Sequence, residues 1–207
     1  KIALVMVMSL FMEILDGTIV TTALPKMATT FSTSMSQISP LISAYLVTVA
    51  IFIPMSGWLA NYFGKKKIWL LAVFLFTISS LGSALAPSFG VLLGMRMLQG
   101  FSGALMTPTA RLIVFEKTPV DQLLKMTSYL VWPALIAPAI APIMGGAIIT
   151  YLSWHWIFLI NLPIGMSILI LGYSLIPSDH DLIKNKFDWL GFVEMAMAST
   201  LLVVGAE

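Results

Sequence analysis

Long apolar stretches alternate with short polar connections along almost the whole chain. A helix that crosses a lipid bilayer needs about 20 mainly apolar residues, and the sequence contains six such stretches and the start of a seventh. The predicted spans are residues 2–25, 39–61, 68–86, 89–115, 126–151, 156–176 and a last one from about 190. The pattern predicts an all-α membrane protein: a six-helix bundle in residues 1–176, a loop in 177–189, and part of a seventh span in 190–207.

Composition agrees with this pattern and excludes several classes of protein. The 207 residues are 59% hydrophobic and 10% charged, whereas a soluble domain is about 45–50% apolar and about 25% charged. A net charge of +2 without a long basic run does not indicate a nucleic acid partner. The absence of cysteine excludes disulfides and thiolate metal sites. No phosphate loop, metal cluster or catalytic triad is visible, so we expect no enzymatic activity, cofactor or metal.

The basic residues predict an orientation in the membrane. Lysines follow the second, fourth and sixth spans, at residues 65–67, 117 and 125, and 184 and 186. Lysine and arginine accumulate in cytoplasmic loops, so these loops and the N-terminus, with Lys1, are expected in the cytoplasm. The chain opens on this lysine rather than on Met, so we expect a short N-terminal piece to be trimmed or missing, and no cleavable signal is predicted.

The six complete spans repeat one arrangement. Spans one to three and spans four to six follow the same order of long span, loop and span, and their orientations are opposite. This order is compatible with a three-plus-three inverted repeat of the kind found in membrane transporters.

Two acidic residues lie inside the first apolar stretch, Glu13 and Asp16. A charged side chain at the middle of a bilayer costs about 2.5–3.5 kcal/mol or more, so such residues usually mark a proton or substrate pathway. Residues three apart share one face of a helix. Burial favours the neutral form of a carboxyl group, a property that a proton-coupling acid needs. The alternative is that either acid is structural and bonds to a neighbouring helix.

Arg96 lies well inside the fourth span, three residues before Gln99. Arginine does not lose its proton in proteins, so it needs a carboxylate, carbonyl groups or water. We predict that Arg96 faces the interior of the bundle, near Gln99 or near Asp16 or Glu13. The alternative is an arginine that extends to the membrane surface.

Several glycines suit special backbone positions. Gly57 and the pair Gly100 and Gly103 are predicted to allow close contact between helices. Gly64, before the lysine run at residues 65–67, is predicted to end the second helix in a left-handed conformation. The alternative for this region is an ordinary basic loop.

The fifth span combines three prolines with a glycine pair: Pro133, Pro138, Pro142, Gly145 and Gly146. Each proline removes a backbone hydrogen bond and bends a helix. We predict a bend near residues 138–142 and a glycine face that, with Asp16 and Arg96, belongs to an inner face left uncovered for a second bundle. Proline and glycine are, however, common in membrane helices of every function.

Five segments resemble signatures of one family, in the correct order. Residues 15–25 (LDGTIVTTALP) look like the first-helix signature LDxTIVNVALP, and residues 57–67 resemble the loop signature GxLADRxGRKK. Arg96, Gln99 and Gly100 resemble a fourth-helix signature. Residues 137–146 resemble GPxxGPxxGG, and residues 154–165 match WRWIFxINxPIG. The chain thus resembles the N-terminal half of the fourteen-helix drug:proton antiporter branch of the major facilitator superfamily.

The chain also departs from these signatures. In the loop signature, Asn61 replaces the acid and Tyr62 replaces the first arginine; in the family, that acid helps to latch the cytoplasmic side through charge pairing. Other replacements are Thr21 for asparagine, Ala137 and Ala141 for two glycines, and His155 for arginine.

The resemblance implies a multi-pass protein of the bacterial inner membrane that exports amphipathic compounds against proton entry by alternating access. It implies proton-coupling or transport roles for Asp16, Glu13, Arg96 and Gln99. Conformational roles are implied for Gly57, Asn61, Gly64, Lys65, Gly100, Pro138, Pro142, Gly145 and Gly146. The expected partners are a small-molecule substrate, protons, the lipid bilayer, and a C-terminal half or second copy that completes the cavity.

Two other functions remain open at this point. The chain could belong to an exporter of an endogenous metabolite or siderophore. It could also be a truncated half-transporter that does not transport, or an assembly component.

Overall fold

The computed structural model describes residues 2–179, 182–183 and 185–205, without the side chains of residues 203 and 204, and contains no strand in these residues. The long helices are α1 (Ile2–Thr30), α3 (Pro40–Phe63), α4 (Lys65–Ala84), α5 (Phe89–Glu116), α6 (Leu123–Tyr151), α8 (Asn161–Leu175) and α9 (Trp189–Gly205). Short turns lie between them, namely α2 (Met35–Ile38), η1 (Val120–Gln122) and α7 (Trp156–Leu159). Parts of the predicted loop and last span (residues 180, 181, 184, 206 and 207) and Lys1 lie outside the described residues.

The helical segments confirm the predicted fold class. Six segments are long and apolar enough to cross a membrane: Ile2–Thr30, Met35–Phe63, Lys65–Ala84, Phe89–Glu116, Val120–Tyr151 and Trp156–Leu175. Each coincides with one predicted span. The helix α9 adds a shorter apolar run, Trp189–Leu202, and packs beside α3, where the rings of Phe192 and Phe52 lie 6.3 Å apart.

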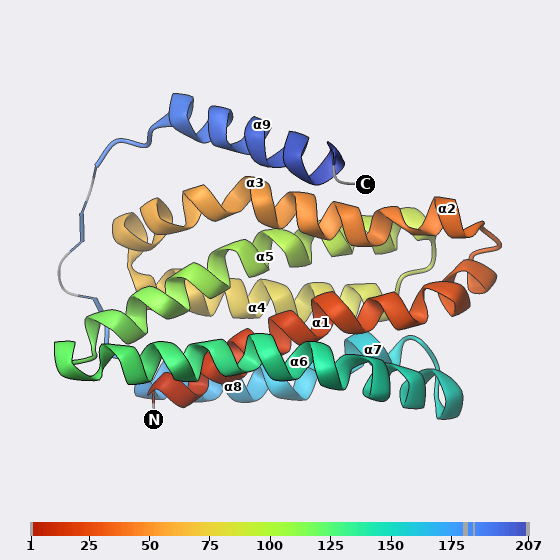
Figure 1. The fold of residues 1–207 in the computed structure, drawn as a ribbon, viewed down its shortest axis with the longest axis horizontal. Coiled ribbons are helices and arrows are strands. Elements are labelled where there is room, and N and C mark those ends of the chain that lie inside the picture. The colour runs from red at the N-terminus through yellow and green to blue at the C-terminus, as the bar shows by residue number, and fades with distance from the viewer. Residues whose placement is uncertain (1, 180–181, 184, 206–207) are drawn as a thin grey trace.

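The contacts between helices follow the predicted inverted repeat. Figure 1 shows α1, α3, α5 and α6 in front of α4 and α8. The most extensive contacts join α3 to α5 and α1 to α6. If α1, α3 and α4 are exchanged with α5, α6 and α8 in that order, the α3–α5 pair becomes the α6–α1 pair. The same exchange relates the α4–α5 contact to the α1–α8 contact, as expected for a pseudo-twofold arrangement.

The first helix is longer than predicted. It was expected to end at Pro25, but α1 continues to Thr30 with the proline inside it. The hydroxyl groups of Thr29 and Thr30 donate to the carbonyl of Lys26 at 2.7 and 2.9 Å. These bonds lie after the proline and do not replace the one that Pro25 removes, which would have joined its backbone nitrogen to the Thr21 carbonyl.

The helix α4 begins three residues earlier than predicted, so the lysine run forms its first turn. Gly64 has φ of +103°, which confirms the predicted need for glycine at this helix exit. Positive side chains are unfavourable at a helix N-terminus. Asp179, from the segment after α8, compensates by accepting a hydrogen bond from the Lys66 backbone amide at 3.0 Å, and Lys65 pairs with Glu116 at 2.7 Å.

The core consists of two apolar clusters along the bundle axis. The first gathers residues 5–12 of α1 with the beginning of α4 and the second half of α5. The second gathers residues 15–28 of α1 with α6, α7 and the beginnings of α3 and α5. The acids of α1 lie at the junction of the two clusters, so the structure places a polar layer halfway along the bundle.

The helix α6 runs without interruption through its three prolines. Pro138, Pro142 and Gly146 are exposed, but Gly145 is buried. A Cβ atom on Gly145 would overlap the Thr22 hydroxyl of α1, whereas a Cβ atom on Gly146 would meet nothing within 4 Å. The prediction that both glycines lie on an uncovered face is therefore wrong for Gly145, since helical geometry turns consecutive residues to different sides.

The two glycines provide a matched pair of variants. Gly145→Ala is expected to destabilise the protein by about 1–3 kcal/mol, because an extra methyl group in a packed contact forces neighbouring atoms to move. Thr22 cannot rotate freely, since its hydroxyl donates to the Ile19 carbonyl at 2.7 Å. Gly146→Ala is expected to leave stability unchanged or slightly raised. Thermal unfolding in detergent would check both, and equal melting temperatures would contradict the helix packing described here.

Candidate functional site

Arg96 lies on α5 at the junction of the two apolar clusters and is 0% exposed. Its guanidinium Nη1 donates to Asp16 Oδ2 on α1 at 2.5 Å and to Gln99 Oε1 at 3.0 Å. Both charged side chains are 0% exposed. The structure therefore brings together three of the predicted site residues, and Arg96 faces the bundle interior as expected.

Three further side chains complete this polar cluster. Asn161 on α8 donates to Asp16 Oδ1 at 2.6 Å and to Ser80 Oγ on α4 at 3.2 Å. Gln99 also donates to Asp16 Oδ1 at 3.3 Å and to Ser80 Oγ at 2.8 Å. The Arg96 guanidinium lies over the ring of Tyr45 on α3, 4.4 Å from its centroid. These six residues, named here the central cluster, join α1, α3, α4, α5 and α8.

Asn161, Ser80 and Tyr45 are not among the predicted site residues. One signal was available, because Asn161 lies inside the signature at residues 154–165. Ser80 shares α4 with two other serines, and both Ser79 and Ser80 donate to the Phe76 carbonyl of their own helix, so the sequence does not distinguish Ser80. Tyr45 provides a ring face, a role that an aromatic residue in an apolar span does not reveal.

The central cluster retains capacity for further polar partners. Arg96 Nε and Nη2 and Asn161 Oδ1 are buried, and no hydrogen bond reaches them from the described residues. Buried polar atoms in proteins are normally hydrogen-bonded, and breaking a buried ion pair costs about 3–5 kcal/mol. The Arg96–Asp16 pair is thus a costly arrangement with unused donors, as expected for a functional site in a membrane.

Asp16 and Arg96 were expected on an inner face open to a second bundle, and this expectation is wrong. The polar side chains of α4 and α8, together with Tyr45, enclose both residues within this chain. An ion pair exposed to lipid would be unfavourable in free energy, and here the helices of this chain shield the Arg96–Asp16 pair from lipid.

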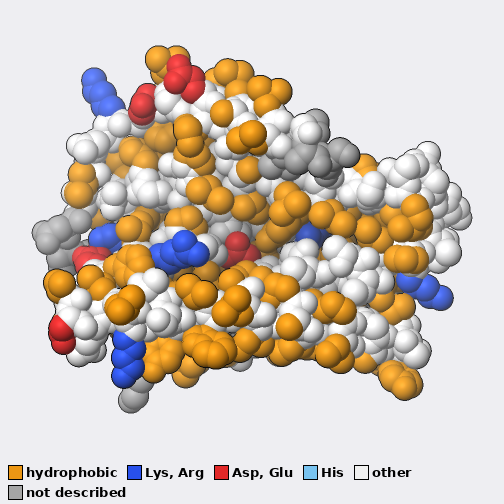
Figure 2. Space-filling view, in the orientation of Figure 1, with side chains coloured by type: hydrophobic (Ala, Val, Ile, Leu, Met, Phe, Trp, Pro, Cys, Tyr) orange, Lys and Arg blue, Asp and Glu red, His pale blue; other side chains and the backbone are white. Residues whose placement is uncertain are grey.

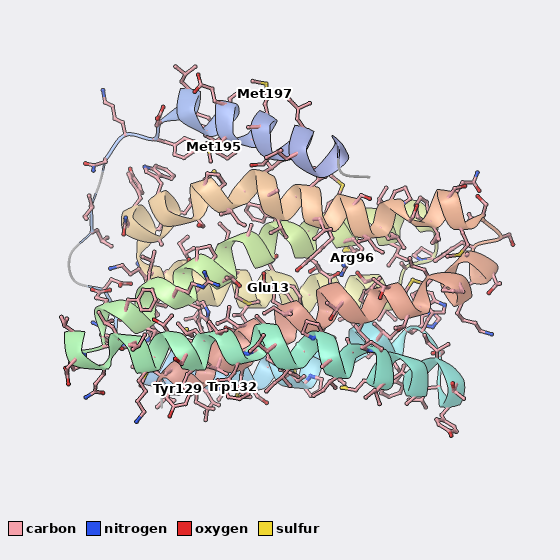
Figure 3. All side chains as sticks on the ribbon, viewed as in Figure 1. Glu13, Arg96, Tyr129, Trp132, Met195 and Met197 are labelled. Atoms are coloured by element: carbon pink, nitrogen blue, oxygen red, sulfur yellow. The ribbon has the colours of Figure 1, made fainter. Side chains whose placement is uncertain are left out.

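Glu13 lies outside the central cluster. Its carboxylate Oε2 accepts a hydrogen bond from the Thr107 hydroxyl of α5, and Glu13 is 8% exposed. Figure 3 shows Glu13 and Arg96 in succession along the band between α5 and α1, with Arg96 nearer the end of the bundle that carries α2. The two acids of α1 therefore have different partners.

Two of the three predicted contact glycines bring helices together. A Cβ on Gly100 would lie 2.6 Å from the Tyr45 carbonyl oxygen, and a Cβ on Gly103 would lie 2.9 Å from Glu13 Oε1. Gly57 does not take part in such a contact, because a Cβ there would meet nothing within 4 Å. That prediction is wrong, since Gly57 lies on an open side of α3, while Ser56 and Ala60 of the same turn are buried on the other side.

The loop signature at residues 57–67 has an acid close to it, although its own acid is replaced. Asn61 contributes its backbone carbonyl, which accepts from the Ile183 amide at 3.1 Å. Trp58 Nε1 donates to the Asn185 carbonyl at 2.9 Å. Asp179 adds the bond to the Lys66 amide described above. Residues Asp179, Ile183 and Asn185, which follow α8, therefore each form a hydrogen bond with the end of α3 or the start of α4.

The amino-acid sequence matches the Major Facilitator Superfamily over residues 6–201. It is 39% identical over 197 residues to proteins named for multidrug resistance, MdtD, from Pectobacterium carotovorum subsp. carotovorum and Escherichia fergusonii. Each alignment covers 95% of this chain and 42% of the relative, so the chain spans about two fifths of these relatives' length.

Solved structures share the fold at low sequence identity. The human organic anion transporter MFSD10 superposes with a TM-score of 0.76 at 15% identity, covering 97% of this chain and 54% of that one. The inward-open xylose transporter XylE of E. coli gives a TM-score of 0.73 at 16% identity, covering 99% and 55%.

Proposed function

This chain belongs to the Major Facilitator Superfamily, and from that premise we propose that it forms the N-terminal half of a proton-coupled exporter of amphipathic compounds. One observation carries the proposal: the fully buried Arg96–Asp16 pair, held by amide and hydroxyl groups from other helices. The substrate class follows the names of the MdtD relatives. The proposed location is the bacterial inner membrane, with the N-terminus and the lysine-rich loops in the cytoplasm.

In this proposal, Asp16 takes up and releases a proton during each transport cycle. Protonation would cancel its charge and weaken its bond to Arg96, which remains charged. Arg96 would then need other partners, and its free Nε and Nη2 donors are available for them. A proton that enters from outside would thereby shift the packing of α1 against α5, the kind of coupling that alternating access requires.

The proposed partner of this chain is a C-terminal half of the same transporter or a second copy of the chain. The relatives are more than twice as long as the aligned segment, and substrate sites of such transporters lie between repeated bundles. In this proposal, the front layer of α1, α3, α5 and α6 forms one wall of the cavity (Figure 1).

The test uses the complete transporter in proteoliposomes with an imposed pH gradient. We expect fluorescent amphipathic dyes to move against their own gradient while protons move in the opposite direction. Dye movement without proton movement would contradict proton coupling. Transport of only one polar metabolite or siderophore, with no dye transported, would favour the endogenous-export alternative.

A further inference from the structure

We propose that Glu13, Thr107 and Arg111 form a binding site for zwitterionic amphipathic compounds, in which Glu13 binds the cationic group and Arg111 the anionic group. This inference deepens the proposed transport function and rests on it. It assigns separate tasks to the two acids of α1, because Asp16 is already bonded within the central cluster.

The site lies along one stripe of α5. Gly103, Thr107 and Arg111 are spaced four residues apart, so they share a helix face. Gly103 leaves space for Glu13, whose Oε1 would be 2.9 Å from a Cβ at this position. Thr107 donates its hydroxyl to Glu13 Oε2. The contact of α1 with α5 therefore directs the carboxylate toward this stripe.

Glu13 retains acceptor capacity that Asp16 has used. An ionised carboxylate has about four acceptor positions. In the described residues, Asp16 accepts from Arg96, Gln99 and Asn161, whereas the Thr107 hydroxyl is the one donor to Glu13. Asp16 is 1% exposed and Glu13 is 8% exposed. A ligand would therefore meet Glu13 before it could reach Asp16.

Arg111 provides the second charge of the site. It is exposed and lies one helical turn beyond Thr107 on α5. Over the described part of the chain, however, it has neither an ion pair nor a side-chain hydrogen bond. The helix α5 ends five residues later, at Glu116, which places Arg111 about 7–8 Å from that end. An arginine at such a depth needs an anionic or polar partner.

The arrangement of the two charges favours a ligand with both signs. Glu13 contacts Thr107, one turn before Arg111 on α5, and no ion pair joins Glu13 to Arg111 in the described residues, so polar groups of a ligand can lie between them. A purely cationic ligand would pair with Glu13 alone, and a purely anionic one with Arg111 alone. Figure 2 shows an acidic group in the middle of this face, with basic side chains near it and apolar side chains around them.

The test compares two dyes that differ in one charge, rhodamine B and its methyl ester. Rhodamine B carries a cationic xanthene and a carboxylate, and the ester lacks the carboxylate charge. Equilibrium binding to the complete transporter in detergent, without a pH gradient, would be followed by fluorescence polarisation. Arg111→Gln should weaken rhodamine B binding by about tenfold or more and leave ester binding unchanged. Glu13→Gln should weaken the binding of both dyes.

A matched control is available in α9. Glu194 is an exposed acid in that helix, and Glu194→Gln should leave the binding of both dyes unchanged. Should Glu13→Gln fail to fold, Arg111→Gln decides the question alone, because exposed Arg111 makes no described contact on which folding depends.

Three results would overturn the inference. Wild-type affinity of Arg111→Gln for rhodamine B would show that Arg111 only extends to the membrane surface. An equal loss of both dyes in Arg111→Gln would exclude recognition of an anionic group. A wild-type protein that binds neither dye would exclude this ligand class at the site. The expected binding pattern without proton-driven efflux would contradict the proposed function and leave this site standing.

Discussion

Asp16→Asn is expected to abolish proton-driven efflux by the complete transporter while the protein still inserts into the membrane. Asparagine keeps the shape of the side chain but carries neither the charge nor the exchangeable proton. Within the described residues, Asp16 is the one carboxylate paired with Arg96, so the variant leaves a buried cation unpaired. Loss of one partner of a buried ion pair costs about 3–5 kcal/mol, so a lower melting temperature is expected as well.

A double variant separates the structural role of the pair from its role in transport. Asp16→Asn combined with Arg96→Gln removes both charges, and replacement of a whole buried pair is often close to neutral for stability. We expect this double variant to regain thermal stability and to remain inactive in dye efflux. Asp121→Asn, an exposed acid in η1, is the control and should transport normally. Efflux with normal pH dependence in either central variant would show that the pair only stabilises the bundle.

The sequence predicted the centre of the site because charge inside a membrane is expensive. Asp16 and Arg96 are separated by 80 residues, yet each needs an opposite charge at similar depth, and few candidates exist. Neutral polar residues do not impose such a requirement. Asn161 and Ser80 carry no charge that must be paired, so only the packing of α8 against α4 shows that Asn161 donates to both Asp16 and Ser80.

The predictions for glycine were less successful for a geometric reason. A glycine shows that a close approach is possible, but it does not show which neighbour makes the approach. Gly100 and Gly103 do lie against other helices, whereas Gly57 lies against none within 4 Å. Gly145 and Gly146 are adjacent in sequence but turn to opposite environments. The rotation of α6 about its axis decides this difference, and it depends on contacts with α1.

The loop signature illustrates a different limit of sequence reasoning. The replacement of its acid by Asn61 suggests the loss of a local carboxylate. The structure places Asp179 at the same connection, 113 residues from its hydrogen-bond partner Lys66. A compensating residue at that distance along the chain cannot be recognised by comparing the loop with its signature.

The 207-residue chain by itself is expected to fold but not to transport. Its central ion pair is enclosed by its own helices, so the bundle does not need a partner to satisfy its most costly charges. The proposed cavity, however, lies between the front layer of this chain and a second bundle. Without that bundle, Glu13 and Arg111 would line only one wall, and no alternation of access between two sides is possible.

The experiment purifies the chain alone, determines its mass in detergent and assays it in liposomes. We expect a folded species without dye transport, and recovery of transport when the remaining part of the transporter is produced together with it. Recovery by dimerisation of the chain itself would favour a second copy as the partner, and a dimer mass would then accompany activity. A monomer that moves dye against a gradient would contradict the two-bundle cavity and, with it, the placement of the substrate pathway at the front layer of α1, α3, α5 and α6.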